Sequence, residues 1–111
     1  MCGIVGIINK SSGSPSLELL KKMADTISHR GPDDEGCFIE KNVGFYHKRL
    51  SIIDIKNGVQ PMSSENYTIV FNGEIYNYVE LRDSLKRKGH SFKTSSDTEV
   101  ILRLYEEYGL D

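Results

Sequence analysis

Two kinds of hydrophobic spacing follow one another in the first third of this chain. Residues 3–9 (GIVGIIN) form a nearly continuous run of β-branched and small residues, which is typical of a buried strand. Apolar residues then recur three or four positions apart up to residue 28, which predicts a helix. Ser14-Pro15 offers this helix an N-cap and a first helical position, and the turn formers of residues 29–34 end it in a loop.

Short strands are expected in the middle of the chain. Residues 36–41 and 43–48 flank a polar pair and predict a β-hairpin. The segment 49–55 fits either a strand or irregular structure, and glycine and proline mark a loop that runs to about residue 66. Residues 67–71 (YTIVF) are rich in β-branched and aromatic side chains, and they predict a further strand.

The last third predicts two helices separated by a short strand at residues 90–94. The helices span about 77–88 and 96–108, and each opens with a capping-box pattern and is followed by glycine. The second helix should turn its Val100, Ile101, Leu104, Tyr105 and Tyr108 side chains inward. Helices and strands do not alternate regularly, so the order of elements predicts an α+β fold with a largely antiparallel sheet.

The composition fits one small soluble domain. The chain has 111 residues, of which 38% are hydrophobic and 27% are charged, and its net charge is −2. Because there is no basic excess and no run of ~20 apolar residues, neither nucleic acid nor a membrane is an expected partner. The first residues also lack the basic and apolar segments of a signal peptide.

Cysteine and histidine usage argues against disulfides and metals. Two cysteines, Cys2 and Cys37, make no disulfide framework, which fits a cytoplasmic setting. Cys37 is expected to be buried. The three histidines, His29, His47 and His90, lie apart from one another and from any cysteine pair, so they predict structural roles rather than a metal site.

The strongest candidate for chemistry is Cys2. If Met1 is removed, which the small size of cysteine favours, Cys2 carries a thiol and a free α-amine. That amine titrates near pH ~7.7–8.0, so it can act as a base at neutral pH. A thiol beside its own base is a nucleophilic unit like the threonine and N-terminal amine pairs. The alternative is that Cys2 is a minor hydrophobic residue at a frayed end.

Three further segments offer groups for one site. The guanidinium of Arg49 can hold a carboxylate with two hydrogen bonds, or it can belong to a solvated or structural arginine. Asn72-Gly73 can form a hairpin turn, or its side-chain amide and backbone N–H can donate to a developing oxyanion. Asp97 can complement the positive end of a helix, or it can bind an ammonium group.

These segments, in this order, resemble the glutaminase domain of glutamine-dependent asparagine synthetases. That domain belongs to the class II glutamine amidotransferases, within the N-terminal-nucleophile hydrolases. The similarity runs essentially end to end, and the strings at 29–33 and 49–54 look more like this family than like amidotransferases with other acceptors. The matching strings are Met1-Cys2-Gly3-Ile4-Val5-Gly6, His29-Arg30-Gly31-Pro32-Asp33, Arg49-Leu50-Ser51-Ile52-Ile53-Asp54, Gln60-Pro61-Met62, Asn72-Gly73-Glu74-Ile75-Tyr76-Asn77 and Ser96-Asp97-Thr98-Glu99-Val100.

The resemblance implies a role for each candidate residue. The Cys2 thiolate would attack the side-chain amide of L-glutamine, with its own α-amine moving the proton, and Asn72 and Gly73 would stabilise the oxyanion. Arg49 would hold the α-carboxylate of glutamine and Asp97 its α-ammonium. The remaining residues implied to line the glutamine pocket are Leu50, Ser51, Ile52, Ile53 and Glu74.

The resemblance also implies an architecture and partners. The family fold is a four-layer αββα sandwich with antiparallel sheets, and a synthetase domain that uses ATP and Mg²⁺ follows it. This chain stops at Asp111, so we expect the N-terminal part of such a domain, at residues 1–111, that is marginally stable alone. The glutaminase part is expected to need no cofactor or metal of its own, and the full-length enzyme could form a homodimer.

Two alternatives stay open at this point. The first is a non-catalytic glutamine-binding or interaction module left by truncation, which would keep Arg49 and Asp97 without turnover. The second is the glutaminase domain of a related amidotransferase whose ammonia goes to an acceptor other than aspartate.

Overall fold

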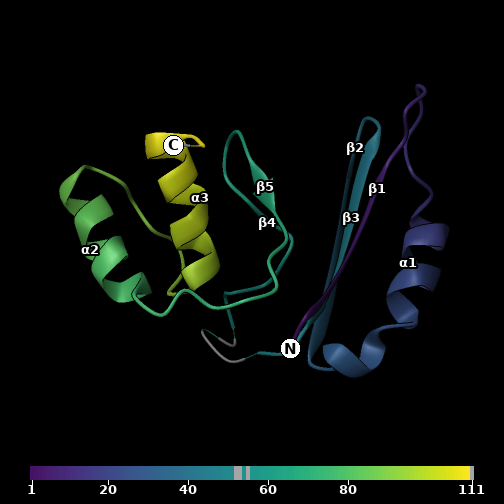
Figure 1. The fold of residues 1–111 in the computed structure, drawn as a ribbon, viewed down its shortest axis with the longest axis horizontal. Coiled ribbons are helices and arrows are strands. Elements are labelled where there is room, and N and C mark those ends of the chain that lie inside the picture. Colours follow the sequence, from purple (N-terminus) through teal and green to yellow (C-terminus); the bar gives the residue numbers. More distant parts are fainter. Residues whose placement is uncertain (52–53, 55, 111) are drawn as a thin grey trace.

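The computed structural model describes residues 1–51, 54 and 56–110, and its strands form two antiparallel sheets (Figure 1). The larger sheet has the strand order β1-β3-β2, with β1 (Gly3–Ile8), β2 (Asp34–Glu40) and β3 (Val43–Arg49). The smaller sheet pairs β4 (Met62–Ser63) with β5 (Thr68–Ile69). The helical elements are α1 (Leu17–Asp25), the 3-10 turn η1 (Ser28–Arg30), α2 (Tyr78–Arg87) and α3 (Asp97–Tyr108). The predicted α+β class with antiparallel pairing is confirmed.

The hydrophobic core lies between α1 and one face of the larger sheet, which lie beside each other on the right of Figure 1. There Val5 and Tyr46 pack with Leu20 and Ala24. Burial alternates along β1, and Ile8 at its end is 69% exposed. The predicted strand is present, but it is buried on one face rather than throughout, because α1 covers only one side of β1.

Several predicted boundaries are confirmed. The hairpin joins β2 to β3 through Lys41 and Asn42, and Lys41 takes a left-handed conformation with φ 54°. Glycine follows both C-terminal helices in left-handed conformations, with φ 100° at Gly89 and 66° at Gly109. A residue without Cβ adopts these angles without strain, so it ends a helix readily.

The first helix starts later than predicted. Its N-cap is Ser16, whose Oγ accepts a hydrogen bond from the backbone N–H of Leu19 at 3.2 Å. Ser14 was the predicted cap, and that prediction is wrong because the serine two positions later makes the capping bond. The helix also ends at Asp25, before the predicted end at residue 28.

Two predicted strands are shorter or absent, because side chains take the backbone hydrogen bonds. Of the predicted strand 67–71, only Thr68–Ile69 pairs, and the N–H of Phe71 donates to the side chain of Gln60 instead. Residues 90–94 form no strand. The N–H groups of Lys93 and Thr94 donate to the carboxylate of Glu99.

Burial differs from prediction at four side chains, namely Cys37, Leu102, Tyr105 and Tyr108. Cys37 is exposed rather than buried, since it lies on β2 at the edge of the larger sheet. On α3, Val100 and Leu102 are buried, whereas Tyr105 and Tyr108 are 37% and 51% exposed. Apolar spacing predicted the helix correctly, but it did not predict how much of each face is covered.

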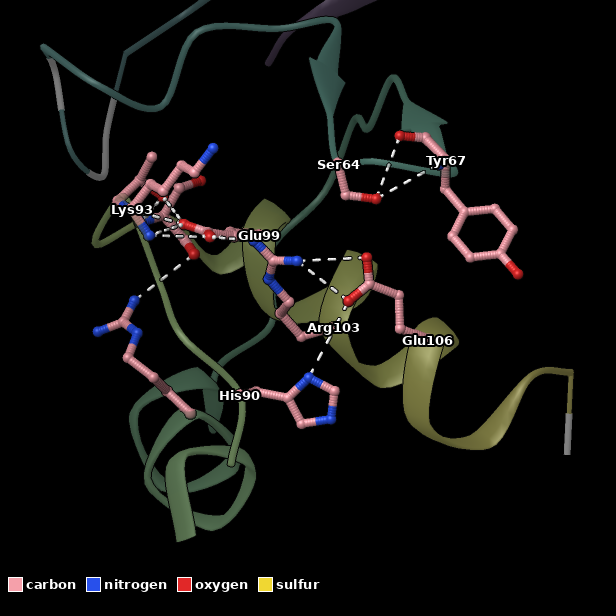
Figure 2. Close-up of polar contacts among 10 residues, drawn as sticks. Ser64, Tyr67, His90, Lys93, Glu99, Arg103 and Glu106 are labelled. Carbon is pink, nitrogen blue, oxygen red and sulfur yellow. Dashed lines mark hydrogen bonds and ion pairs between the residues drawn. The ribbon is translucent and has the colours of Figure 1, made fainter. Parts of the chain in front are cut away.

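Figure 2 shows polar contacts of α3. Some of them bind residues 93 and 94, in the segment that leads into this helix. The buried carboxylate of Glu99 accepts from the N–H and the Oγ1 of Thr94, each at 2.7 Å, and from Arg103 at 3.2 Å. Burial raises the pKa of Glu99, but these donors and the Lys93 N–H together hold the pKa below its usual value. The predicted capping box is half correct, since Ser96 caps α3 while Glu99 binds residues 93 and 94.

His90 has a partner that its isolated position in the sequence did not reveal. Its Nε2 lies 2.7 Å from an oxygen of Glu107, and its Nδ1 lies 4.0 Å from Glu106. These contacts join the segment after α2 to the last turns of α3, so the structural role predicted for His90 fits its surroundings.

Candidate active site

A single cavity of about 440 Å³ brings together segments that are far apart in the sequence. It lies where the start of β1, the end of β3, the segment after β5 and the first turn of α3 meet. The predicted site residues on its wall are Cys2, Arg49, Leu50, Asn72, Gly73, Glu74 and Asp97. Ser51 is not among the described residues that line it, and the predicted Ile52 and Ile53 lie outside the described residues.

Cys2 is held at the edge of this cavity by backbone contacts. The N–H of Leu50 donates to Sγ of Cys2 at 3.3 Å, and Sγ lies 3.6 Å from the Leu50 carbonyl oxygen. The Nε–H of Arg30 donates to the Cys2 carbonyl at 3.1 Å. These contacts fix the position of the sulfur at the cavity edge, where a nucleophile would have to lie.

The segment 29–33, to which the sequence assigned no catalytic role, holds the backbone at the end of β3. The N–H of Asp33 donates to the Arg49 carbonyl at 2.9 Å, and the Ser51 N–H donates to Oδ2 of Asp33 at 2.8 Å. Gly31 lies so close to β3 that an added Cβ would overlap backbone atoms of Lys48 and Arg49. This loop therefore fixes the backbone position from which the Arg49 side chain extends.

We expect Gly31→Ala to destabilise the protein by about 2 kcal/mol or more, because overpacking against a backbone that cannot move aside typically costs about 1–3 kcal/mol. Urea unfolding of the full protein measures this change. The matched control is Gly6→Ala, whose Cβ would meet nothing closer than the Phe45 ring at 3.6 Å, an ordinary contact. Equal stability of the two variants would contradict the close approach of this loop to β3.

Arg49 is 4% exposed, so it is not the solvated arginine that one alternative allowed. Its Nη2 donates to the backbone carbonyl of Asp54 at 2.7 Å. The Asp54 side chain in turn accepts from the N–H of Ser95 at 2.6 Å, and that hydrogen bond is the main reason that the pKa of Asp54 is lowered. Asp54 thus links Arg49 to the turn before Asp97, a connection that only its place in the 49–54 string could have suggested.

Asp97 is buried at the start of α3, and one of its oxygens is already used. Oδ2 accepts from the N–H of Ile75 at 3.0 Å, which ties the 72–75 segment to this helix. The N-cap of α3 is Ser96 and not Asp97. The Oγ of Ser96 accepts a hydrogen bond from the Thr98 N–H at 3.1 Å. The capping need of α3 is therefore met without Asp97, which leaves its carboxylate on the cavity wall.

Asn72-Gly73 is not a hairpin turn. No strand follows it among the described residues up to α2, so one of the two alternatives for this pair is wrong. Both residues line the same cavity as Cys2. An added Cβ at Gly73 would lie 2.9 Å from the Phe71 ring, so a larger residue requires that ring or the 72–73 segment to shift.

Sequence reasoning missed two buried polar side chains at the cavity: Gln60, which lines its wall, and His47, which contacts the wall residue Phe71 from behind. Nε2 of His47 lies 3.3 Å from the carbonyl oxygen of Phe71, and Oε1 of Gln60 accepts from the Phe71 N–H at 2.5 Å. Gln60 also donates to Oγ1 of Thr98 at 3.1 Å. The Gln60-Pro61-Met62 string was a signal for Gln60, whereas nothing local distinguished His47 from a packing residue.

The described part of the chain contains neither a grouping of metal ligands nor a helix suited to a membrane. Among residues 1–51, 54 and 56–110, no three histidine, cysteine or acidic side chains are grouped so that they could hold a metal ion. None of the helices in that part of the chain has the length and apolar character needed to cross a bilayer.

An α+β fold whose cavity holds a cysteine, an arginine, an asparagine-glycine pair and an aspartate points to an amidotransferase, and comparison supports this. Residues 1–111 match the family described as the glutamine amidotransferase domain, and the chain belongs to that family. Its antiparallel sheets are consistent with an incomplete N-terminal-nucleophile hydrolase domain.

The similar curated proteins are asparagine synthetases. Asparagine synthetase [glutamine-hydrolyzing] 1 of Bacillus subtilis (strain 168) is 53% identical over 113 residues, which cover 97% of this chain and 18% of that protein. The second enzyme of that name in the same organism is 54% identical, over 99% of this chain and 15% of its own length. Asparagine synthetase [glutamine-hydrolyzing] 1 of Arabidopsis thaliana is 44% identical, over 100% of this chain and 19% of its own. The chain thus spans less than a fifth of each of these relatives.

Proposed function

We propose that this chain is the N-terminal part of a type 2 glutamine amidotransferase domain that hydrolyses L-glutamine to glutamate and ammonia. In the full protein, a synthetase domain would use the ammonia to convert ATP-activated aspartate to asparagine. The observation that carries the proposal is the cavity that joins Cys2 to Asn72, Gly73, Arg49 and Asp97.

The reaction begins at Cys2 once Met1 has been removed. The α-amine of Cys2, acting through a water, takes the thiol proton, and Sγ forms a bond to the amide carbon of glutamine. The oxyanion that develops accepts hydrogen bonds from the Asn72 side chain and the Gly73 N–H. The C–N bond then breaks, the amine returns a proton to the leaving ammonia, and water hydrolyses the thioester to release glutamate.

Two opposite charges hold the other end of the substrate. Arg49 pairs with the α-carboxylate of glutamine and Asp97 with its α-ammonium, while Leu50 and Glu74 line the pocket between them. Both charged side chains are buried, at 4% and 6% exposure, so each is screened little by solvent. An analogue that lacks either charge leaves its partner unpaired, which excludes it from the site.

The proposal extends to the surroundings of the domain. The glutaminase step itself uses no metal or cofactor, whereas the synthetase domain would bind ATP and Mg²⁺. We place the protein in the cytoplasm, with L-glutamine and the synthetase domain as its partners and with a homodimer as the full-length form. Neither nucleic acid nor a membrane takes part.

Labelling with a diazo-ketone analogue of glutamine tests the function. Such an electrophile should alkylate Cys2 in the full protein once Met1 is absent, and peptide mass mapping should place the adduct there. Cys37→Ala should label like the unaltered protein, since Cys37 lies outside the cavity wall, whereas Cys2→Ala should not label. Absence of labelling in a folded sample without Met1 would favour the binding-module alternative.

We expect Asn72→Ala to lower kcat for glutamine hydrolysis about 10²–10³-fold, which is the usual loss for one oxyanion donor. KM for glutamine should change little, because the donor acts mainly in the transition state. Steady-state ammonia release measures both constants. The matched control is Asn77→Ala, since Asn77 is exposed and makes no capping hydrogen bond at α2. A rise in KM with kcat unchanged would assign Asn72 to ground-state binding instead.

A further inference from the structure

We propose that His47 and Gln60 are positioning residues for glutamine hydrolysis, which act by holding the backbone of Phe71 directly before the oxyanion donors Asn72 and Gly73. This inference rests on the proposed function and adds two residues to it. Neither side chain belongs to the groups that would touch the reacting atoms.

The backbone at Phe71 lacks the support of a sheet. Pairing in β5 ends at Ile69, and α2 begins only at Tyr78. The two side chains supply the hydrogen bonds that a neighbouring strand would otherwise provide. His47 binds the C=O of Phe71, and Gln60 accepts from its N–H. The Phe71 carbonyl shares a rigid peptide plane with the N–H of Asn72, so fixing that carbonyl fixes the direction in which Asn72 starts.

The environment of His47 favours such a specific role over packing. The side chain is 0% exposed on β3, two residues before Arg49. A carbonyl faces Nε2, so Nε2 must carry the proton, and this leaves Nδ1 as a buried acceptor without a partner. Burial lowers the pKa of His47, which keeps the ring neutral. An apolar side chain would fill this space without an unpaired nitrogen, so the hydrogen bond to Phe71 explains the choice of histidine.

Gln60 connects the same backbone to the other end of the substrate site. It is 6% exposed, and while Oε1 accepts from the Phe71 N–H, Nε2 donates to Oγ1 of Thr98. Thr98 follows Asp97 in the first turn of α3. The two hydrogen bonds of one buried amide therefore relate the position of Asn72 to that of Asp97.

The test compares His47→Leu, which removes the donor, with His47→Gln, whose side-chain amide can donate to the same carbonyl. In the full protein, His47→Leu should lower kcat for glutamine hydrolysis about 10–100-fold with KM nearly unchanged. Loss of a positioning residue should lower kcat less than loss of the oxyanion donor that it positions. His47→Gln should stay within about threefold of the unaltered protein. His90→Leu, a histidine bonded to Glu107 outside the cavity wall, is the matched control and should keep full activity.

A double-mutant cycle separates positioning from general stability. If His47 acts through Asn72, adding His47→Leu to Asn72→Ala should cost less than about threefold more in kcat, because interacting residues are non-additive. Should His47→Leu fail to fold, Gln60→Met and Gln60→Glu carry the same comparison, since only glutamate keeps an acceptor for the Phe71 N–H.

The outcomes are distinct. An undiminished His47→Leu defect in the Asn72→Ala background, or a KM effect without a kcat effect, would overturn the positioning role while leaving the proposed function intact. No hydrolysis and no Cys2 labelling in the unaltered protein would instead remove the proposed function, and this inference with it.

Discussion

Cys2→Ala should lower glutamine hydrolysis by ~10⁴-fold or more, since removing the nucleophile of a covalent hydrolase leaves only the contribution of binding and oxyanion contacts. Glutamine affinity should remain within a few fold, because Arg49 and Asp97 are untouched and lie elsewhere on the cavity wall. Ammonia release gives the rate, and calorimetry on the full protein gives the affinity.

The matched control for this experiment is Cys37→Ala. Cys37 is an exposed thiol on the edge strand β2, so its removal tests whether any cysteine substitution impairs the protein. Turnover in this variant should equal that of the unaltered protein. If Cys2→Ala still hydrolysed glutamine at a comparable rate, the thioester mechanism would be wrong. If both proteins bound glutamine and neither hydrolysed it, the non-catalytic module would be the better description.

Retention of Met1 should lower the rate of glutamine hydrolysis about 10²–10⁴-fold, which is the usual range for a lost general base. With Met1 in place, the nitrogen of Cys2 is an amide and cannot accept the thiol proton. Met1 also lines the cavity, although it is 68% exposed, so retaining this residue leaves less room in the site. Both effects act in the same direction.

A removable leader gives the sharpest form of this experiment. A leader whose proteolysis leaves Cys2 as the first residue allows the same folded protein to be assayed before and after cleavage, with intact mass reporting the state of the N-terminus. Activity should rise as the uncleaved mass disappears. Equal rates in the two states would refute the α-amine as the base and would direct attention to other groups on the cavity wall.

Local sequence chemistry accounts for most elements of the fold. The hairpin at Lys41 and Asn42, the helix stops at Gly89 and Gly109, and the period of α3 all follow from neighbouring residues. Short-range signals were wrong where a distant side chain took over a backbone hydrogen bond. Residues 67–71 and 90–94 have the composition of strands, yet Gln60 and Glu99 bind their N–H groups instead.

For the candidate site, too, the sequence predicted some features and only the structure showed others. Residue type and family resemblance were enough to propose Cys2, Arg49, Asn72 and Asp97, since each chemical role demands a particular functional group. No pattern of spacing could show that they share one cavity, or that Asp54 connects Arg49 to the turn before Asp97.

The amino-acid sequence alone thus predicted the family and the α+β class, and it supplied the candidates for the reacting groups. The tertiary structure decided which groups lie next to one another, including the hydrogen bonds of His47 and Gln60 to the backbone of Phe71. The physical reason is the distance along the chain over which each kind of interaction acts. Propensity, capping and turn preferences act over a few residues, whereas contacts such as Cys2 to Leu50, 48 positions apart, form only when the packing of the whole chain closes that distance.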